Sequence, residues 1–364
     1  MNPSSKPPTQ GNDPDQLPRL WTRAQRALRR LLTGAIFSYT LGLAVLFLSM
    51  EFIGERFWPL AVLLYLPQGV FLLPLIILVP AALLAEVSLG EYAMLAGSVI
   101  IFLLHVPFHP GLGGRPGTVN LKVVTNNYAQ NHGLRIQPFI DKEDPDFVAL
   151  EDAAGQGRGL KRDNPGRTLL EVRQWILISK TPVNSGAVLK WPTWKGDPVG
   201  AVFDVTWQGK ELVFYTIHMP SPRGDFAKLA GLGLAKELAG RNRRRSDNMS
   251  FAEAMTARVQ LARDLAAVFA GEKRPFVALG DFNMPPDGYV HRVITAGLTD
   301  CFAQAGLGFG FTFPCDTHNP LTLGGPWLRL DYALAGPGWR AQQCRVEPDR
   351  RSKHRAVVVT LSRD

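Results

Sequence analysis

Cysteine is scarce in this chain of 364 residues, which contains only Cys301, Cys315 and Cys344. Their spacing matches no paired pattern of zinc ligands, and an odd number of thiols does not make a disulfide framework. A single disulfide would require an oxidising compartment. Three unlinked thiols are the alternative, and the sequence leaves both open.

Charge is scarce in one part of the chain. Residues 31–108 carry only five Asp, Glu, Lys or Arg side chains, whereas the remainder is polar and mixed in charge. Over the whole chain, 46% of residues are hydrophobic and 20% are charged, which is close to the average of soluble proteins. The averages therefore conceal an apolar region joined to a polar one.

The apolar region contains three runs. Residues 31–50 carry no charge, and as a helix they would measure about 30 Å, the thickness of a bilayer core. Residues 60–85 form a second run, broken by prolines that bundled membrane helices tolerate, and residues 92–108 form a shorter third run. A soluble core does not account for two such runs, and a signal peptide would carry a small-residue cleavage site. We predict a multi-pass transmembrane region over residues 31–108, with three helices in the inner (cytoplasmic) membrane.

The formal net charge of +9 favours partners that carry phosphate or an anionic lipid surface. Residues 1–30 are predicted to be a disordered, basic and cytoplasmic amino terminus, because positive charge stays on the cytoplasmic side of membrane proteins. The arginines before the first run are Arg19, Arg23, Arg26, Arg29 and Arg30. Three spans would then place the remainder in the periplasm or outside the cell, and two spans would keep it in the cytoplasm.

Residues 109–118 are rich in Gly and Pro and are predicted to be a linker. A domain over residues 119–364 follows, in which many short β-type runs and few helical ones favour packed sheets covered by helices, an α/β fold. Strands are predicted over 119–125, 147–151, 174–179, 201–206, 212–218, 276–281, 331–335 and 356–361, and helices over 226–239 and 251–270.

Polar side chains stand at the ends of six of these strands. Each one alone is a common turn former, but together they combine the ligands that Mg²⁺ prefers with histidines suited to acid–base work near neutral pH. The pattern therefore predicts metal-assisted phosphoryl chemistry. The residues are Asn126, Asn127, Glu151, Asp152, His218, Asp281, Asn283, Asp331, Lys353 and His354.

The order of these motifs resembles the endonuclease/exonuclease/phosphatase superfamily, the deoxyribonuclease I-like proteins, over roughly residues 119–363. Gly-Asp-Phe-Asn at 280–283 is the most specific motif, and the run 145–152, His218 and Ser-Lys-His at 352–354 follow in the family's order. The resemblance implies a four-layer α/β sandwich, two packed mixed sheets flanked by helices, with the site at one edge. It also implies a metal-dependent phosphodiesterase or phosphatase that uses Mg²⁺ or Mn²⁺.

The resemblance assigns the metal to Asp152, with Asn127 holding the metal network and contacting substrate. Glu151 stands where the family has a neutral neighbour, and Asp152 is one methylene shorter than the family's glutamate. Because successive strand residues point to opposite faces, Glu151 and Asp152 should not both reach the ion without a local bulge. Either the ion shifts or binds through water, or Glu151 takes part.

The catalytic roles also follow from the resemblance. His218 lies near the scissile phosphate, and Asp281 and Asn283 orient the attacking water and contact the phosphate. Asp331 hydrogen-bonds His354 and fixes its tautomer. These residues predict an in-line attack by water on a phosphorus ester, assisted by electrostatic stabilisation.

Lys353 replaces the aspartate that usually precedes the last histidine of the family. As an ammonium beside the phosphate, it would bind substrate, or its presence would weaken metal binding. Hydrolysis of a phosphodiester or phosphomonoester beside a membrane is therefore the predicted function, and a catalytically weakened, membrane-bound phosphate-binding module is the alternative. The substrate is unresolved between lipid, envelope and nucleic acid, and no motif reads bases.

Overall fold

The computed structural model describes residues 16–113, 119–129, 135–229, 234, 249–315, 318, 322–348, 350 and 352–363. The chain divides into two compact units, one made of residues 1–46 and 71–102, the other of residues 47–70 and 103–364. Each unit has its own core.

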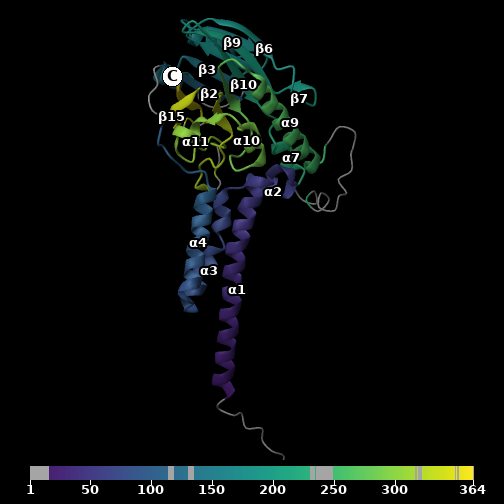
Figure 1. Cartoon of the computed structure of the whole chain (residues 1–364), viewed down its shortest axis with the longest axis vertical. Coiled ribbons are helices and arrows are strands. Elements are labelled where there is room, and N and C mark those ends of the chain that lie inside the picture. Colours follow the sequence, from purple (N-terminus) through teal and green to yellow (C-terminus); the bar gives the residue numbers. More distant parts are fainter. Residues whose placement is uncertain are drawn as a thin grey trace, which may run out of the picture. The chain divides into compact units, whose positions relative to one another are not determined.

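The first unit is helical, and a hairpin of two helices packs against the longest helix of the chain (Figure 1). Ile36 on the long helix meets Ala82 and Leu95 on the hairpin in an apolar cluster. Polar pairs add to this contact, since the hydroxyls of Thr40 and Ser98 lie 2.8 Å apart. The helices are α1 (Gln16–Phe52), α3 (Leu75–Leu84) and α4 (Leu89–His105).

One described helix, residues 23–52, is long and apolar enough to cross a membrane. The second apolar run passes the same test only as a pair, α2 (Trp58–Leu64) with residues 68–84, which is bent by 98°. The third run gives α4, whose 17 residues fall short of that length. The prediction of a multi-pass region with three spanning helices is therefore wrong, because prolines divide the second run into helices of roughly half the bilayer thickness.

The second unit contains two six-stranded mixed sheets. One sheet has the order β15-β16-β2-β3-β5-β4, and the other has the order β12-β14-β11-β10-β9-β6. The strands of the first are β2 (Val119–Asn127), β3 (Phe147–Glu151), β4 (Thr168–Val172), β5 (Trp175–Ser179), β15 (Arg340–Val346) and β16 (Val357–Arg363). Those of the second are β6 (Val183–Val188), β9 (Gly200–Trp207), β10 (Lys210–His218), β11 (Phe276–Asp281), β12 (Thr299–Asp300) and β14 (Asp331–Ala335).

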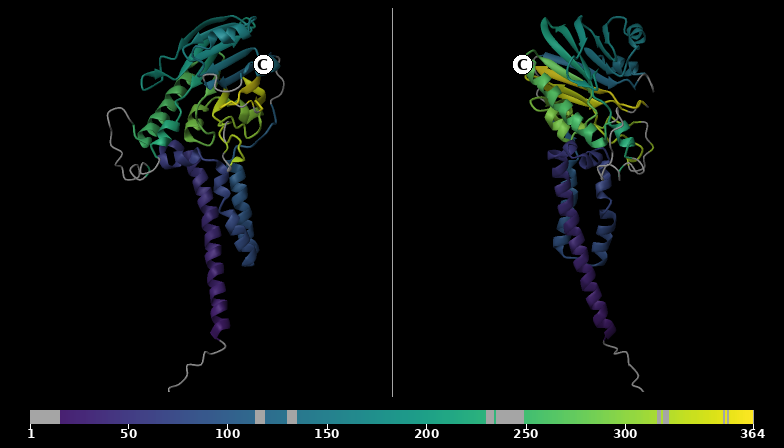
Figure 2. Two further views of the ribbon diagram at one scale, coloured as in Figure 1. Left: turned by 180° about the vertical axis from the view of Figure 1, so that it is seen from behind. Right: turned by 90° about the vertical axis from the view of Figure 1, so that its right-hand side faces the viewer.

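The sheets pack face to face, as the right-hand view in Figure 2 shows, and their inner faces share one apolar core that includes Phe147 and Phe214. A second core lies between the outer face of the second sheet and two helices, α9 (Phe251–Gly271) and α10 (Tyr289–Ile294). A third core covers the outer face of the first sheet. It involves α5 (Gln137–Glu143) and α6 (Gly157–Asp163). The predicted four-layer α/β sandwich is confirmed.

Each predicted strand has a counterpart, whereas β4, β6 and β15 were not predicted. In β6 and β15 exposed polar residues alternate with partly buried ones, which weakens the apolar signal of a strand. The predicted helix 226–239 lies mostly outside the described residues, and α7 (Arg223–Ala227) occupies its beginning. Among the described residues, which include the three cysteines, no disulfide forms.

Residues 47–70, which the sequence pattern assigns to the transmembrane region, belong to the compact unit of the sheets. The buried Ala61 of α2 packs into an apolar cluster with Phe251 and Met255 of α9, and the rings of Trp58 and Phe251 meet edge to face at 5.9 Å. Glu55 is also buried and accepts a hydrogen bond of 3.1 Å from the backbone amide of Val290. The segment between the apolar helices is thus part of the sandwich.

This packing predicts an energetic coupling between Trp58 and Phe251 in the full chain. The double substitution Trp58→Ala with Phe251→Ala should cost less than the sum of the single ones by on the order of 1 kcal/mol, because each single substitution already removes the aromatic contact. Denaturant unfolding in detergent measures the three free energies. The matched control pairs Trp58→Ala with Phe269→Ala, a buried residue of α9 outside this cluster, and should be additive. Additivity in both pairs would contradict the packing.

Candidate active site

Strand pairing brings the predicted site residues together at one edge of the two sheets. In the first sheet, β2 and β3 run parallel, with Asn127 opposite Glu151 at their ends. In the second sheet, β10 and β11 run parallel with His218 opposite Asp281, and β14 places Asp331 opposite Asp281 from the other side. Parallel neighbours end at the same edge of a sheet, so apolar strands of ordinary length deliver these polar residues to one place.

Asp281 is the centre of the cluster. Its Oδ2 accepts hydrogen bonds from Nδ2 of Asn127 at 3.0 Å and from Nδ2 of Asn283 at 3.1 Å. Nε2 of His218 and Nε2 of His354 each lie 3.9 Å from the same oxygen. Asp281 is buried, and one carboxylate oxygen therefore joins side chains from both sheets.

His354 is held by Asp331. Nδ1 of His354 donates to Oδ2 of Asp331 at 2.9 Å, which leaves Nε2 directed toward Asp281. Burial alone would lower the pKa of His354, but the charge and hydrogen bond of Asp331 outweigh burial and raise it to about 9. Asp331 is itself oriented by Thr312, whose Oγ1 accepts hydrogen bonds from the backbone amides of Leu330 and Asp331.

Glu151 is fully buried beside two other carboxylates. Burial raises its pKa well above the usual value, and the charges of Asp331 and Asp281 raise it further. Oγ1 of Thr125 donates to Oε1 of Glu151 at 3.1 Å. Burial and the charge of Asp331 also raise the pKa of Asp281, although the two histidines act against this shift. Like charges this close in an apolar interior call for a compensating positive charge.

Asp152 directly follows β3, which ends at Glu151, so the alternation of a regular strand does not apply to it. Its φ of 52° lies in the left-handed region, so the backbone leaves the strand geometry at this residue. Its charge contributes to the raised pKa of His354. The predicted bulge is not present, because β3 ends at Glu151 and pairs regularly with β2 and β5, and Asp152 lies beyond the strand.

Gly280 allows the sheets to approach each other this closely. Its φ is 128°, and a Cβ at this position would lie 2.0 Å from the backbone oxygen of Ile217 and 3.1 Å from Cδ of Glu151. Any side chain here would displace either the neighbouring strand or the buried carboxylate. The glycine of the Gly-Asp-Phe-Asn motif thus has a steric role.

Several supporting residues are not apparent from the motifs. Oε1 of Gln174 accepts a hydrogen bond of 2.9 Å from Nδ1 of His218. The backbone oxygen of Asn283 accepts hydrogen bonds from the hydroxyl of Tyr65 at 2.7 Å and from the guanidinium of the buried Arg258. The motifs assign Arg258 no role, and they cannot identify Tyr65 because it lies in an apolar run.

The described residues contain one group whose ligand atoms could hold a metal ion together. Asp281, Asp331 and His354 each offer one atom, and these atoms lie within 4.8 Å of one another. Asp331 Oδ1 is buried and has no hydrogen-bond partner among the described residues. This donor set, with Glu151 and Asp152 beside it, suits a hard cation. The chemical roles of the individual residues remain predictions.

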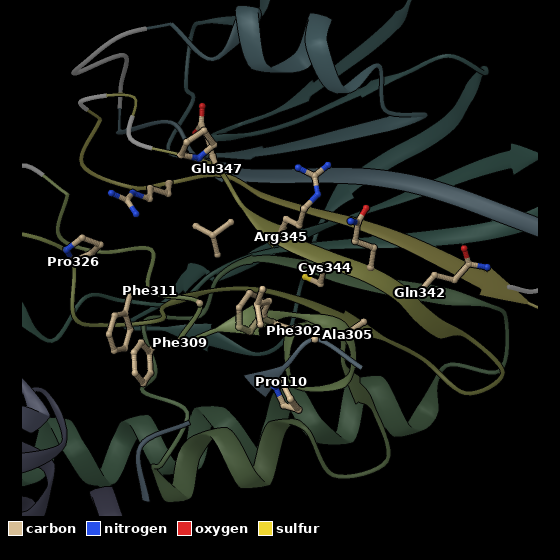
Figure 3. Close-up of a pocket in the computed structure, with 17 residues that line it drawn as sticks. Pro110, Phe302, Ala305, Phe309, Phe311, Pro326, Gln342, Cys344, Arg345 and Glu347 are labelled. Atoms are coloured by element: carbon tan, nitrogen blue, oxygen red, sulfur yellow. The ribbon is translucent and has the colours of Figure 1, made fainter. Parts of the chain in front are cut away.

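Two large cavities among the described residues of this unit bear on the site. The smaller one, of about 460 Å³, is lined by Asn283 and Lys353 and so adjoins the cluster. The larger one, of about 810 Å³, lies between β15 and α11 (Cys301–Ala305), and no predicted site residue lines it (Figure 3). The predicted site residues therefore lie beside the smaller cavity.

Comparison with protein families finds a match over residues 117–354 to the Endonuclease/Exonuclease/phosphatase family. The fold is similar to that of an endonuclease/exonuclease/phosphatase from Beutenbergia cavernae DSM 12333, at 19% identity over 67% of this chain and 72% of that one, with a TM-score of 0.44. A family member from Bacteroides thetaiotaomicron has 15% identity, coverages of 68% and 96%, and a TM-score of 0.45.

The D. rerio protein TDP2, in a complex with a single-strand DNA product, has 15% identity, coverages of 67% and 99%, and a TM-score of 0.46. No curated protein sequence matches the chain.

The hydrogen bond from Tyr65 predicts that a residue outside the family match supports the Asn283 turn. Tyr65→Phe should lower the free energy of unfolding by about 0.5–1.5 kcal/mol and also lower turnover of a phosphoester, because the turn loses a donor beside Asp281. The control is Tyr215→Phe, whose hydroxyl donates to Glu272 away from the site; it should lose similar stability and keep its activity. Equal activity in both variants would show that the Tyr65 hydroxyl does not support the site.

Proposed function

This chain belongs to the endonuclease/exonuclease/phosphatase family and has its hydrolase fold, and on that premise we propose that it is a membrane-anchored, divalent-metal-dependent phosphoesterase. The observation that carries the proposal is the Oδ2 atom of Asp281, which meets two amides and two imidazoles at one sheet edge. A structural ion pair would need one partner, whereas a site that positions water and phosphate needs several converging groups.

Glu151 and Asp152, with Asn127 beside them, are the side chains we assign to a divalent cation, Mg²⁺ or Mn²⁺. Asp331 is less available because its Oδ2 already accepts the hydrogen bond of His354. When bound, such a cation supplies Lewis-acid polarisation of a phosphoryl oxygen and compensates the charge of the crowded carboxylates. Asp331 with Asp281 and His354 is the alternative ligand set.

The remaining residues position the reactants. Asp281, fixed by Asn127 and Asn283, orients the attacking water and accepts its proton. His354 and His218 present their Nε2 atoms toward Asp281, where they can donate to phosphoryl oxygens and stabilise developing negative charge. Lys353 lines the adjoining cavity and provides a positive charge for the phosphate.

Membrane anchoring rests on α1. It is the described helix with the length and composition to span a bilayer, and arginines that favour a cytoplasmic location precede its apolar part. α3 and α4 are each shorter than α1 and are not counted as crossings in this proposal. We therefore propose a single anchor with the catalytic domain in the periplasm or outside the cell.

The substrate class follows less directly from the cluster. A phosphodiester or phosphomonoester suits the residues equally, and one solved structure with a similar fold holds a DNA product. Nucleic acid would need stacking surfaces or base-reading groups, and the position beside a bilayer favours lipid or envelope phosphoesters. The non-catalytic alternative, a phosphate-binding module, draws support from Lys353 and from the short Asp152.

Activity of the full chain in detergent tests the proposal. The chain should hydrolyse bis(p-nitrophenyl) phosphate in the presence of Mg²⁺ or Mn²⁺, lose this activity in EDTA and regain it when metal is restored. Asp281→Ala and His354→Ala should each lower the rate by about a hundredfold or more, because each removes a group that touches the reacting atoms. The control Asp204→Asn alters an exposed ion pair with Arg274 and should keep the rate.

Equal rates in all these variants would remove the hydrolase proposal. The double variant Lys353→Asp with Asp152→Glu then distinguishes the hydrolase from the phosphate-binding module. Hydrolysis that appears only in this double variant indicates that the natural chain is a binding module without turnover.

The single-anchor topology predicts where a surface cysteine is accessible. Lys210 is exposed at the start of β10, and in Lys210→Cys a membrane-impermeant maleimide should label this position in intact cells. Labelling only after permeabilisation would place the domain in the cytoplasm and contradict the topology. Cys301 and Cys344 are buried but Cys315 is partly exposed, so the test uses a Cys315→Ser background and the control is that background without Lys210→Cys.

A further inference from the structure

The smaller cavity begins at the catalytic side chains. Asn283 lines it, and so does Phe313, whose ring contacts the ring of His354 with centroids 4.6 Å apart. A group that fills the cavity would therefore be attached to a phosphate near His354 and Asp281. No sequence motif and no part of the proposed reaction accounts for this space.

Aromatic side chains from distant parts of the chain form much of the cavity wall. The rings of Tyr65 and Phe226 meet at 5.1 Å, and Nε1 of Trp327 donates to the backbone oxygen of Tyr65 at 3.2 Å. The wall is completed by Pro222, Pro314, Leu328 and Leu330. Aromatic and aliphatic surfaces thus dominate the lining.

The polar atoms of these aromatic residues face away from a ligand. The Tyr65 hydroxyl donates to the backbone oxygen of Asn283, and the Trp327 indole donates to Tyr65. Both groups are therefore used within the protein, and the rings offer apolar faces. Ser221 and Asn283 are the uncharged polar residues of the lining, so the cavity offers few partners to the hydrogen-bonding edge of a nucleobase, whereas an alkyl chain needs none.

The charged residues of the lining are Arg223 and Lys353, and no lining residue is acidic. Two cations beside an apolar space match a ligand with an anionic head and an apolar tail. The positive groups would hold the phosphate at the site, and the aromatic wall would hold the tail.

Apolar side chains are also accessible in the segment that contributes Tyr65 to the cavity wall. Tyr65 follows α2, in the segment between the apolar helices α1 and α3, and Phe52, Ile53, Phe57 and Leu66 of that segment are exposed. Exposed large apolar side chains next to a membrane-spanning helix are typical of a bilayer interface. The exposed side chains and Tyr65 belong to one unit, so the segment that lines the cavity also carries apolar surface for an amphiphile.

Resting on the proposed phosphoesterase function, we propose that this cavity binds the alkyl chain of an amphiphilic phosphoester. Hydrolysis forms a bond from a water oxygen to phosphorus and breaks one phosphorus–oxygen ester bond. The leaving alcohol takes one proton of the water, and the acidic phosphate product releases or keeps the other.

The test compares two esters with one leaving group, methyl p-nitrophenyl phosphate and hexadecyl p-nitrophenyl phosphate, on the full chain in mixed micelles. The ratio of kcat/KM for hexadecyl to methyl should be about tenfold or more, the scale of discrimination by an apolar pocket. Phe226→Gln should lower this ratio by about tenfold, because it places an amide against the chain.

Phe309→Gln is the matched control. Phe309 is partly exposed and stacks on Phe311 in the larger cavity (Figure 3), so this substitution should leave the ratio as in the wild type. A ratio near one in the wild type would overturn the proposal. So would a ratio that falls in Phe309→Gln and is unchanged in Phe226→Gln.

A second measurement uses the unaltered chain and so does not depend on the folding of a variant. Hexadecyl phosphate with a diazirine near the end of its chain should cross-link to Tyr65, Phe226 or Trp327, as mapped by mass spectrometry. Label on Phe309 or Phe311 instead, or label absent from all five rings, would overturn the proposal. Cross-linking at the smaller cavity with no turnover of either ester would refute the phosphoesterase function and leave the binding site standing.

Discussion

The arrangement of the site depends on the environment of one atom, Oδ2 of Asp281. Asn127 reaches it from the first sheet, and Asn283 and His218 reach it from the second. His354 approaches from the strand that borders β2 and is fixed by Asp331. Without this carboxylate the two amides would lose their acceptor and the histidines their common neighbour. The packing of the sheets is therefore what brings the reactive groups into register.

The same packing crowds Glu151, Asp281 and Asp331 in a buried space. Burial and mutual repulsion raise the pKa values of Glu151 and Asp281, and this is the electrostatic cost of gathering acids where water is excluded. Positive charge at the site offsets that cost. His354 supplies part of it, and a divalent cation at the candidate metal group would supply more.

The segment that follows α1 packs against the unit that contains the candidate site. Glu55 and Ala61 bury themselves against α9 and α10, and Tyr65 donates to the Asn283 turn. Tyr65 of this segment therefore contributes to the wall of the cavity beside the cluster. This arrangement suits the amphiphilic substrate that we propose.

The sequence alone determined the sandwich and the candidates for its site, because apolar strand runs ending in acids, amides and imidazoles are local patterns. It also indicated that Glu151 and Asp152 should not both reach an ion without a local bulge, whereas β3 ends at Glu151 and Asp152 follows it with a left-handed backbone. Only the tertiary structure decided that α3 and α4 are too short to span, that Tyr65 and Arg258 support Asn283, and that an aromatic cavity adjoins His354. These features depend on contacts between residues far apart in the chain. The sequence of an apolar run does not show whether lipid or protein will cover it.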